Sequence, residues 1–548
     1  MITRFAIVTL IFFFLSTIFV IQPWSFHVQL PILGKRKVTI GLMTAPIVTI
    51  ALLWAAQCLG ATQIRDGIVG TDNIKPYNIL ILFISLAYMA ITLDCTGVLQ
   101  AAAFWVSNKG GKSGRKLYFY FYLLLTVISM IVGNDPVILS GTPEAWLISE
   151  FAAANTASMV LFVGNPTNVV ICEGFRINNA AFTAYTILPF LACSIACYLA
   201  LMLQYRKEIH VPKKLNVSAA LDPLAVLRDP VSAIFGSIWL AICLIVVIVL
   251  SFIHVDVWKI VLPFAGGKFI FDIAWDHYRY TTGRIPKFDE NKAENARSPT
   301  DPMAAAIERA MSSEMQRNGT AQSFATLKHH GDSDPSSLST NGILDPEIPR
   351  SASPAGPPSI RKANPLFPSF QHWLGKTHRR LAAHFPTFFT ALPRLPFGLI
   401  PFAFSQFILI EALEHQGWID IFSRWLVIAS KGSIHPVVWL VGIFGVILCN
   451  ISGTNIGATI LLTKIIRTSQ FDPATDRAAA VALAVASNIG AVSFTFSASL
   501  AGLLWVAILK DKGITIKQWR FAMWNSLPLL AMTGVGLGVV SAMMAVLY

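Results

Sequence analysis

Apolar runs of roughly 20 residues alternate with short polar loops along most of the chain. The clearest runs lie at 2–24, 38–60, 78–98, 184–204, 231–255 and 526–548. A helix of this length crosses roughly 30 Å of hydrocarbon. The pattern therefore predicts an all-α polytopic membrane protein. The first run lacks a small-residue cleavage site, so we expect a membrane span there instead of a cleaved leader.

The apolar pattern repeats at an offset of 320 residues. The paired positions are Pro76 and Pro396, Leu93 and Leu413, Asp94 and Glu414, and Gly97 and Gly417. Each copy also contains two small polar interruptions, at 133–136 and 154–157 in the first and at 453–455 and 487–490 in the second. A repeated membrane unit with interrupted helices is typical of secondary transporters.

The interruptions predict where the backbone leaves the helical path. An unpaired backbone group in hydrocarbon costs several kcal/mol, so such breaks survive only inside protein or beside water. We predict two inverted-topology repeats, each with a re-entrant hairpin and a discontinuous helix. The hairpins are expected at 118–149 and 435–467, and the breaks should meet near the membrane centre.

The polar stretches divide the chain into five predicted parts. These are a first transmembrane repeat at 1–205, a cytosolic connector at 206–230, the first two spans of the second repeat at 231–275, a disordered basic and polar cytosolic linker at 276–393, and the remainder of the second repeat at 394–548. The linker is too rich in Ser, Pro and charge to offset the entropy of ordering. The span at 260–275 is expected to be weak, because Pro263 and Lys268 interrupt it.

Composition agrees with a membrane protein and narrows the partners. Apolar residues make up 54% of the chain and charged residues only 13%, against about 25% charged in soluble domains. The net charge of +13 comes from Lys and Arg that gather in loops, which indicates span orientation. No nucleic-acid partner is expected. The seven cysteines show no spacing typical of a zinc site, so we predict no metal and no cofactor.

Several short motifs, taken in order, resemble the arsenite/antimonite permeases of the ion transporter superfamily. They are Leu93-Asp94-x-x-Gly97, Gly133-Asn134-Asp135-Pro136, Ala154-Asn155-Thr156-Ala157 and the final Ser499-Leu500-Ala501-Gly502. Citrate-transporter-like and silicon-efflux proteins are relatives of these permeases. The resemblance implies that hairpin tips at 134–135 and 452–455, and unwound segments at 155–168 and 488–499, hold the substrate.

Two departures from the permease pattern leave the substrate and the coupling ion open. The second tip has Thr454-Asn455 where the permeases often have paired asparagines, and the segment 490–496 is uncharged. Amide and hydroxyl groups can bind substrate oxygens or cap the broken helices instead. The candidate substrate-binding residues are Asn134, Asn155, Thr156, Asn165, Thr167, Asn168, Ser452, Thr454, Asn455, Asn488 and Ser499.

Acidic residues within apolar segments are the candidates for proton or cation coupling. Asp135 is expected to face a cavity, a cation or a proton pathway, with capping of the hairpin helix as the alternative. Asp94 and Glu414 are repeat-related, so both should lie on a proton route or both should brace their spans. Lys464 is expected to snorkel at the base of the second hairpin.

The expected function is secondary active transport of a small oxyanion or its neutral acid, coupled to protons or a cation. The resemblance favours arsenite- or antimonite-like efflux. Citrate-type carboxylate transport and sodium/proton antiport stay open, and a passive channel is the alternative from another class. No enzyme is expected. The expected partners are a small inorganic or organic anion, a coupling proton or sodium, and the bilayer of a plasma or vacuolar-type membrane. A homodimer is a candidate assembly.

Overall fold

The computed structural model describes residues 3–30, 34–71, 73–111, 113–132, 143–214, 222–250, 252, 255–285, 368–511 and 514–548. They form two compact units, one made of Met1–Arg279 and Phe385–Tyr548 and the other of Tyr280–His384. The smaller unit contains helix α14 (Pro368–His384).

The larger unit is built almost entirely of helices. Its first half contains α1 (Arg4–Ile21), β1 (Trp24–Leu30), β2 (Gly34–Ile40), α2 (Thr44–Ala55), α3 (Ala61–Val69), α4 (Pro76–Cys95), α5 (Val98–Gly110), α6 (Gly114–Val132), α7 (Pro143–Ala157), η1 (Phe162–Gly164), α8 (Pro166–Phe175) and α9 (Asn179–Gln204). Its second half contains α10 (Pro230–Leu250), α11 (Val257–Thr281), α15 (Pro386–Ala391), η3 (Leu392–Arg394), α16 (Leu399–His415), α17 (Trp418–Ser430), α18 (Ile434–Ile451), α19 (Asn455–Thr468), α20 (Pro473–Ala491), η4 (Phe496–Ala498), α21 (Leu500–Asp511) and α22 (Gln518–Leu547).

Seven stretches of the described residues are long and apolar enough to cross a membrane. They are α1, α4, α9, α10, the stretch Pro386–His415 that includes α15 and α16, α18 and α22. Five of the six clearest predicted runs correspond to one of them. The run at 38–60 was wrong as a span, because it contains the end of β2 and the 12-residue helix α2.

One antiparallel pair of strands is present beside the helices that the sequence predicted. β1 pairs with β2 from Trp24 opposite Ile40 to Leu30 opposite Gly34. Polar and apolar residues alternate along β1, and this period of two is typical of a strand. The hydroxyls of Ser25 and Thr39 are 2.9 Å apart across the pair. The alternation along β1 is short, and it was missed because the prediction relied on the length and mean hydropathy of the surrounding apolar runs.

Helix α11 corrects two further predictions. It runs unbroken through Pro263 and Lys268 to Thr281, where we expected a weak span ending at 275 and then a disordered linker. The other end of the predicted 276–393 linker is also helical, in α14 and α15. Residues 286–367 lie outside the described residues.

The repeated acid-x-x-Gly motif forms the same turn in both halves. Gly97 and Gly417 have φ angles of +84° and +78°, in the left-handed region that glycine adopts at little cost. Their N–H groups donate to the carbonyl oxygens of Asp94 and Glu414, at 2.9 and 2.8 Å. Each turn ends one helix and begins the next, α4 to α5 and α16 to α17. The repeat read from the sequence is therefore present in the local structure.

The two predicted hairpins have different outcomes. A helical hairpin is present where the second was predicted, because α18 and α19 are joined by the tip 452–454 and pack together. That this hairpin is re-entrant stays a prediction. In the first half the expected end at Ser149 is absent, since α7 continues to Ala157. The tip of the first hairpin lies outside the described residues.

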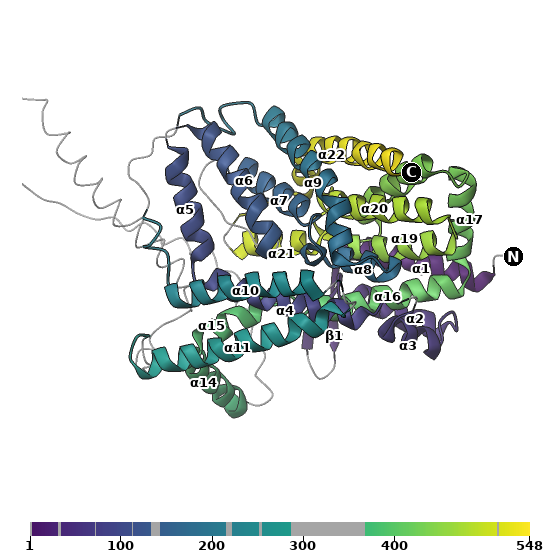
Figure 1. Ribbon diagram of the computed structural model, residues 1–548. Coiled ribbons are helices and arrows are strands. Elements are labelled where there is room, and N and C mark those ends of the chain that lie inside the picture. The colour runs from purple at the N-terminus through teal and green to yellow at the C-terminus, as the bar shows by residue number, and fades with distance from the viewer. Residues whose placement is uncertain are drawn as a thin grey trace, which may run out of the picture. The chain divides into compact units, whose positions relative to one another are not determined.

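Helix α20 lies at the centre of the second half. Figure 1 shows α22, α20, α19 and α16 side by side in this order, and each contacts the next. All residues of α20 from Ala478 to Ala491 are buried. Its many alanines permit close helix packing, as small residues do in membrane proteins. The last turns of α20 carry the first residues of the candidate site.

Candidate functional site

Two helices are interrupted at corresponding places in the two halves. α7 ends at Ala157 and α8 begins at Pro166, while α20 ends at Ala491 and α21 begins at Leu500, which leaves eight residues in each break. Each break contains one short 3-10 turn, η1 or η4. The two breaks therefore have the same length and the same kind of short turn.

Asn155 and Asn488 lie inside helices, not in the unwound segments where we expected them. Asn155 Nδ2 donates to the Phe151 carbonyl and Asn488 Nδ2 donates to the Ala484 carbonyl, both at 2.9 Å. A side-chain bond to the carbonyl four residues earlier is compatible with a continuing helix. The helices therefore end two or three residues later than predicted, and each asparagine keeps its Oδ1 for other donors.

The breaks of the two halves are joined by a reciprocal pair of hydrogen bonds. Ser499 Oγ donates to Asn155 Oδ1 at 3.1 Å, and Asn165 Nδ2 donates to Asn488 Oδ1 at 3.1 Å. Asn165 and Ser499 are the last residues of their breaks, directly before α8 and α21. The last residue of each break thus donates a hydrogen bond to an asparagine of the other half, as expected of two segments related by a two-fold axis.

Further polar side chains extend these bonds into one buried cluster, which we call the crossing network. Asn488 Nδ2 also donates to Asn168 Oδ1 at 2.8 Å, and Ser158 Oγ donates to Asn488 Oδ1 at 2.9 Å. Ser487 Oγ donates to Thr167 Oγ1 at 3.4 Å. The network comprises Asn155, Ser158, Asn165, Thr167, Asn168, Ser487, Asn488 and Ser499, all buried.

Sequence reasoning missed two members of the crossing network. Ser158 lies within the predicted segment 155–168 and Ser487 within the interruption at 487–490, but neither was among the candidate substrate-binding residues. Thr156 is not in the network, because its hydroxyl donates to the Ala152 carbonyl and lies 3.2 Å from the sulfur of Met532. Asn134 and Asp135 lie outside the described residues.

The tip of the second hairpin is close to the second break. Ser452 Oγ donates to the Thr454 carbonyl at 3.0 Å, and Thr454 caps α19 by accepting from the N–H of Gly457 at 3.3 Å. One turn before the tip, Asn450 Oδ1 accepts from the N–H of Phe494 at 2.8 Å. This bond ties the hairpin to the second break. Ser452, Thr454 and Asn455 are all buried.

The repeat-related acids Asp94 and Glu414 each form an ion pair. Asp94 pairs with Arg394 at 3.3 Å, with 23% and 42% of the side chains exposed. Glu414 pairs with Lys464, which also contacts Glu411 at 2.8 Å. Lys464 is 3% exposed, so the snorkelling prediction was wrong. Two carboxylates stabilise its charge within the protein.

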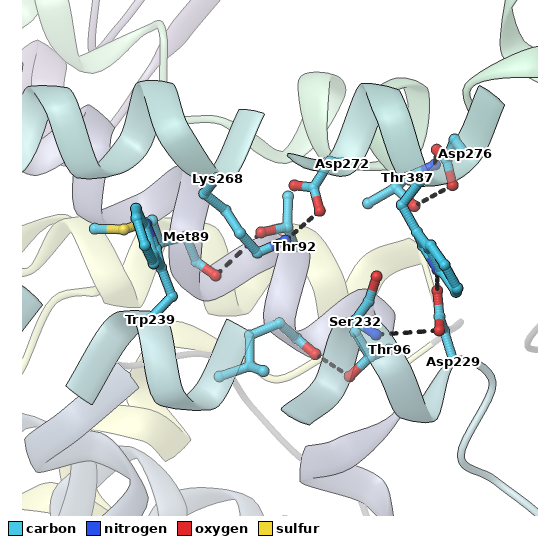
Figure 2. Close-up of polar contacts among 12 residues, drawn as sticks. Met89, Thr92, Thr96, Asp229, Ser232, Trp239, Lys268, Asp272, Asp276 and Thr387 are labelled. Atoms are coloured by element: carbon cyan, nitrogen blue, oxygen red, sulfur yellow. Dashed lines mark hydrogen bonds and ion pairs between the residues drawn. The ribbon is translucent and has the colours of Figure 1, made fainter. Parts of the chain in front are cut away.

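A second buried cation was also missed. Lys268 of α11 pairs with Asp272 one turn later, and both side chains are almost completely buried. Tyr88 of α4 donates to the other Asp272 oxygen at 3.0 Å. Figure 2 shows Lys268 and Asp272 between helices. The sequence analysis identified Lys268 only as an interruption of the span, although Asp272 lies four residues later. Tyr88, which completes the pair from α4, is 184 residues from Asp272.

The charged face of α11 continues toward its end. Asp276 accepts from the N–H and the hydroxyl of Thr387, at 2.8 and 3.0 Å. Asp229 accepts from the indole of Trp275 and from Arg279, both at 2.9 Å. These contacts, several of which appear in Figure 2, join α11 to α15 and to the start of α10. They fix the helix that the sequence showed as the weakest span.

The citrate transporter family model matches residues 32–276. This part of the chain is therefore similar to the citrate transporter family. The arsenical pump membrane protein of Yersinia enterocolitica is 27% identical over 256 residues, covering 42% of this chain and 58% of that protein. Its counterpart in Escherichia coli strain K12 is 24% identical over 253 residues, with the same coverage. The chain spans little more than half of the length of these relatives.

A solved structure gives a distant likeness. The YdaH transporter of Alcanivorax borkumensis aligns over 98% of this chain and 97% of its own, at 12% identity and a TM-score of 0.43. The predicted resemblance to arsenite permease-like ion transporters is confirmed by the family match and the arsenical pump relatives. Together with the seven apolar helices, it identifies a multi-pass membrane protein.

Proposed function

We propose that this protein is a secondary active transporter of a small hydroxylated acid or its oxyanion, of which arsenite and antimonite are the favoured examples. The observation that carries the proposal is the crossing network, in which neutral amides and hydroxyls from two repeat-related breaks meet in the interior. Irregular backbone at membrane depth belongs beside a cavity or inside protein. Repeat-related breaks are typical of alternating access.

The chemistry of the network favours an uncharged substrate over a multivalent carboxylate. Its members are amides and hydroxyls, which both donate and accept hydrogen bonds. A small molecule with several hydroxyls matches such a lining, because each hydroxyl also donates and accepts. Lys464 follows Asn455 by nine residues on α19, which is roughly 13 Å along the axis. Citrate-type recognition would call for a cation nearer to the network.

The relatives point to the same class of substrate. Two of them are named arsenical pump membrane proteins. We propose efflux as the direction of transport, with protons or sodium as the coupling ion. Asp135 stays the first candidate for coupling. Asp94 pairs with Arg394 and Glu414 with Lys464, which favours bracing roles for both acids.

Metalloid accumulation in cells without their own exporters tests the proposal. Expression of the chain should lower cellular arsenite or antimonite, and Asn488→Ala should abolish this effect because it removes the acceptor shared by both halves. Thr533→Val is the matched control, since among the described residues the Thr533 hydroxyl bonds only to the Leu529 carbonyl of its own helix. Unchanged accumulation on expression of the native chain would refute metalloid export.

Energised vesicles separate the alternatives. An imposed proton or sodium gradient should drive arsenite uphill if the protein is a coupled transporter, whereas a passive channel only equalises concentrations. A sodium/proton antiporter would exchange these cations without arsenite. Citrate uptake without metalloid movement would support the carboxylate alternative.

A further inference from the structure

Gln406 of α16 is a buried amide without a partner. Its side chain is 0% exposed, and neither Oε1 nor Nε2 has a hydrogen-bond partner among the described residues. Buried amides almost always find partners, and leaving one unpaired destabilises the fold. The residues on either side of Gln406 are also buried, so this part of α16 has no face on which water would satisfy the amide.

The amide of Gln406 lies against the first turn of α19. A Cβ added to Gly457 would lie 3.0 Å from Gln406 Oε1 and 3.7 Å from the Ser452 carbonyl oxygen. A larger residue at this position would crowd the amide, so the glycine permits its close approach to the helix. α16 and α19 pack directly against each other. The amide is therefore directed at the tip of the second hairpin.

The first turn of α19 offers further donors at the same place. Thr454 caps the N–H of Gly457, but the N–H groups of Asn455 and Ile456 precede the first intrahelical bond and have no carbonyl four residues earlier in the helix. The helix start also favours an electron-rich oxygen. The unpaired amide of Gln406 and the first turn of α19 thus face each other, and the buried hydroxyls of Ser452 and Thr454 lie in the adjoining tip.

We infer that Gln406 is a specificity-determining residue that binds an oxygen of the hydroxylated substrate between its amide and the start of α19. The inference rests on the proposed function and adds a residue from a helix outside both breaks. Nε2 can donate to a substrate oxygen while Oε1 accepts from a substrate hydroxyl. A fully ionised oxyanion has no hydroxyl for Oε1, so this subsite selects the protonated acid.

A purely structural role predicts different behaviour, and Asn525 of α22 provides the matched control. Asn525 is also 0% exposed, and its two amide atoms also lack partners among the described residues. Gln406→Met and Asn525→Leu each replace an orphan amide with an apolar side chain of similar size. Neither change should lower the unfolding temperature, because each removes an unsatisfied buried group.

The experiment measures arsenite transport by the full-length protein in energised vesicles, with unfolding temperature in detergent as a parallel readout. Gln406→Met should raise KM about tenfold, the effect of losing one hydrogen-bonding group toward substrate, and should change the maximal rate little. Asn525→Leu should leave KM unchanged. Gln406→Glu should transport better as pH falls, because a protonated carboxyl donates and accepts as the amide does.

Three outcomes overturn the inference, and they are distinguishable. An unchanged KM in a stably folded Gln406→Met protein shows that the amide does not contact substrate. An equal rise in KM for Asn525→Leu shows that loss of any buried amide has the same effect. Absence of both arsenite and antimonite transport by the native protein refutes the proposed function and the inference together.

Discussion

Asn155 and Asn488 of the crossing network are unequally bonded, which predicts unequal costs of their removal. Asn488 Oδ1 accepts from Ser158 and Asn165, and its Nδ2 donates to Asn168 Oδ1 and to the Ala484 carbonyl. The Asn155 side chain donates to the Phe151 carbonyl and accepts from Ser499. Asn488→Ala should therefore be the more damaging change.

The magnitude follows from the groups left without a partner. Asn488→Ala strands Asn165 Nδ2 and Asn168 Oδ1, which have no other hydrogen-bond partner among the described residues, whereas Asn155→Ala strands Ser499 Oγ. A stranded buried polar group costs about 1–3 kcal/mol. The free energy of unfolding should fall by about 2–6 kcal/mol for Asn488→Ala and about 1–3 kcal/mol for Asn155→Ala.

Thermal unfolding of the purified variants in detergent measures the order, and double-variant cycles measure the two reciprocal bonds. The coupling free energy between Asn155 and Ser499 should match that between Asn488 and Asn165, because the two bonds have equal lengths of 3.1 Å. Bonded neighbours couple by about 0.5–3 kcal/mol. Coupling near zero in either cycle, or greater loss in Asn155→Ala than in Asn488→Ala, would refute the reasoning.

Three other predictions concern charged groups. Lys268→Met should destabilise the protein by about 3–5 kcal/mol by leaving Asp272 as an uncompensated buried charge, and adding Asp272→Leu should recover part of the loss in thermal unfolding; no recovery would argue against the ion pair. Asp94→Asn breaks a partly exposed pair with Arg394, so its unfolding free energy should change by less than about 1 kcal/mol, and an altered pH profile of transport would instead indicate a coupling role. Hydrogen bonds from Thr475 lower the pKa of Asp472, so Asp472 stabilises the fold above its unfolded-state pKa, and this contribution is lost as pH falls through the folded-state pKa. Asp472→Ala should then lower the unfolding temperature at neutral pH and not in acid, and equal lowering at both would contradict the reasoning.

Part of the candidate site could be predicted because its signals are local. Pro166 and the polar residues around it predict a helix start, and Asn165 does cap α8 by accepting from the N–H of Thr167 at 3.2 Å. Thr454 likewise caps α19. The exact helix ends could not be predicted, because Asn155 and Asn488 suit both a break and a helix. In the structure, their side chains donate to the carbonyl oxygens of Phe151 and Ala484, and both asparagines remain within their helices.

The sequence by itself determined four features of this protein. They are its membrane character, the repeat at an offset of 320 residues, the paired turns at Gly97 and Gly417, and the approximate places of both breaks. Each depends on residues within a few turns of one another, where hydrophobic length and backbone preference act directly. The strand pair at 24–40 was local as well, and the apolar length of its surroundings concealed it.

The tertiary structure alone decided which polar groups meet. The bond between Asn155 and Ser499 joins residues 344 positions apart, and the buried pair of Lys268 and Asp272 is completed by Tyr88 from another helix. Gln406 is unremarkable in the sequence and becomes informative only when folding buries it without a partner. Desolvation depends on every neighbour in space, so no local pattern along the chain encodes it.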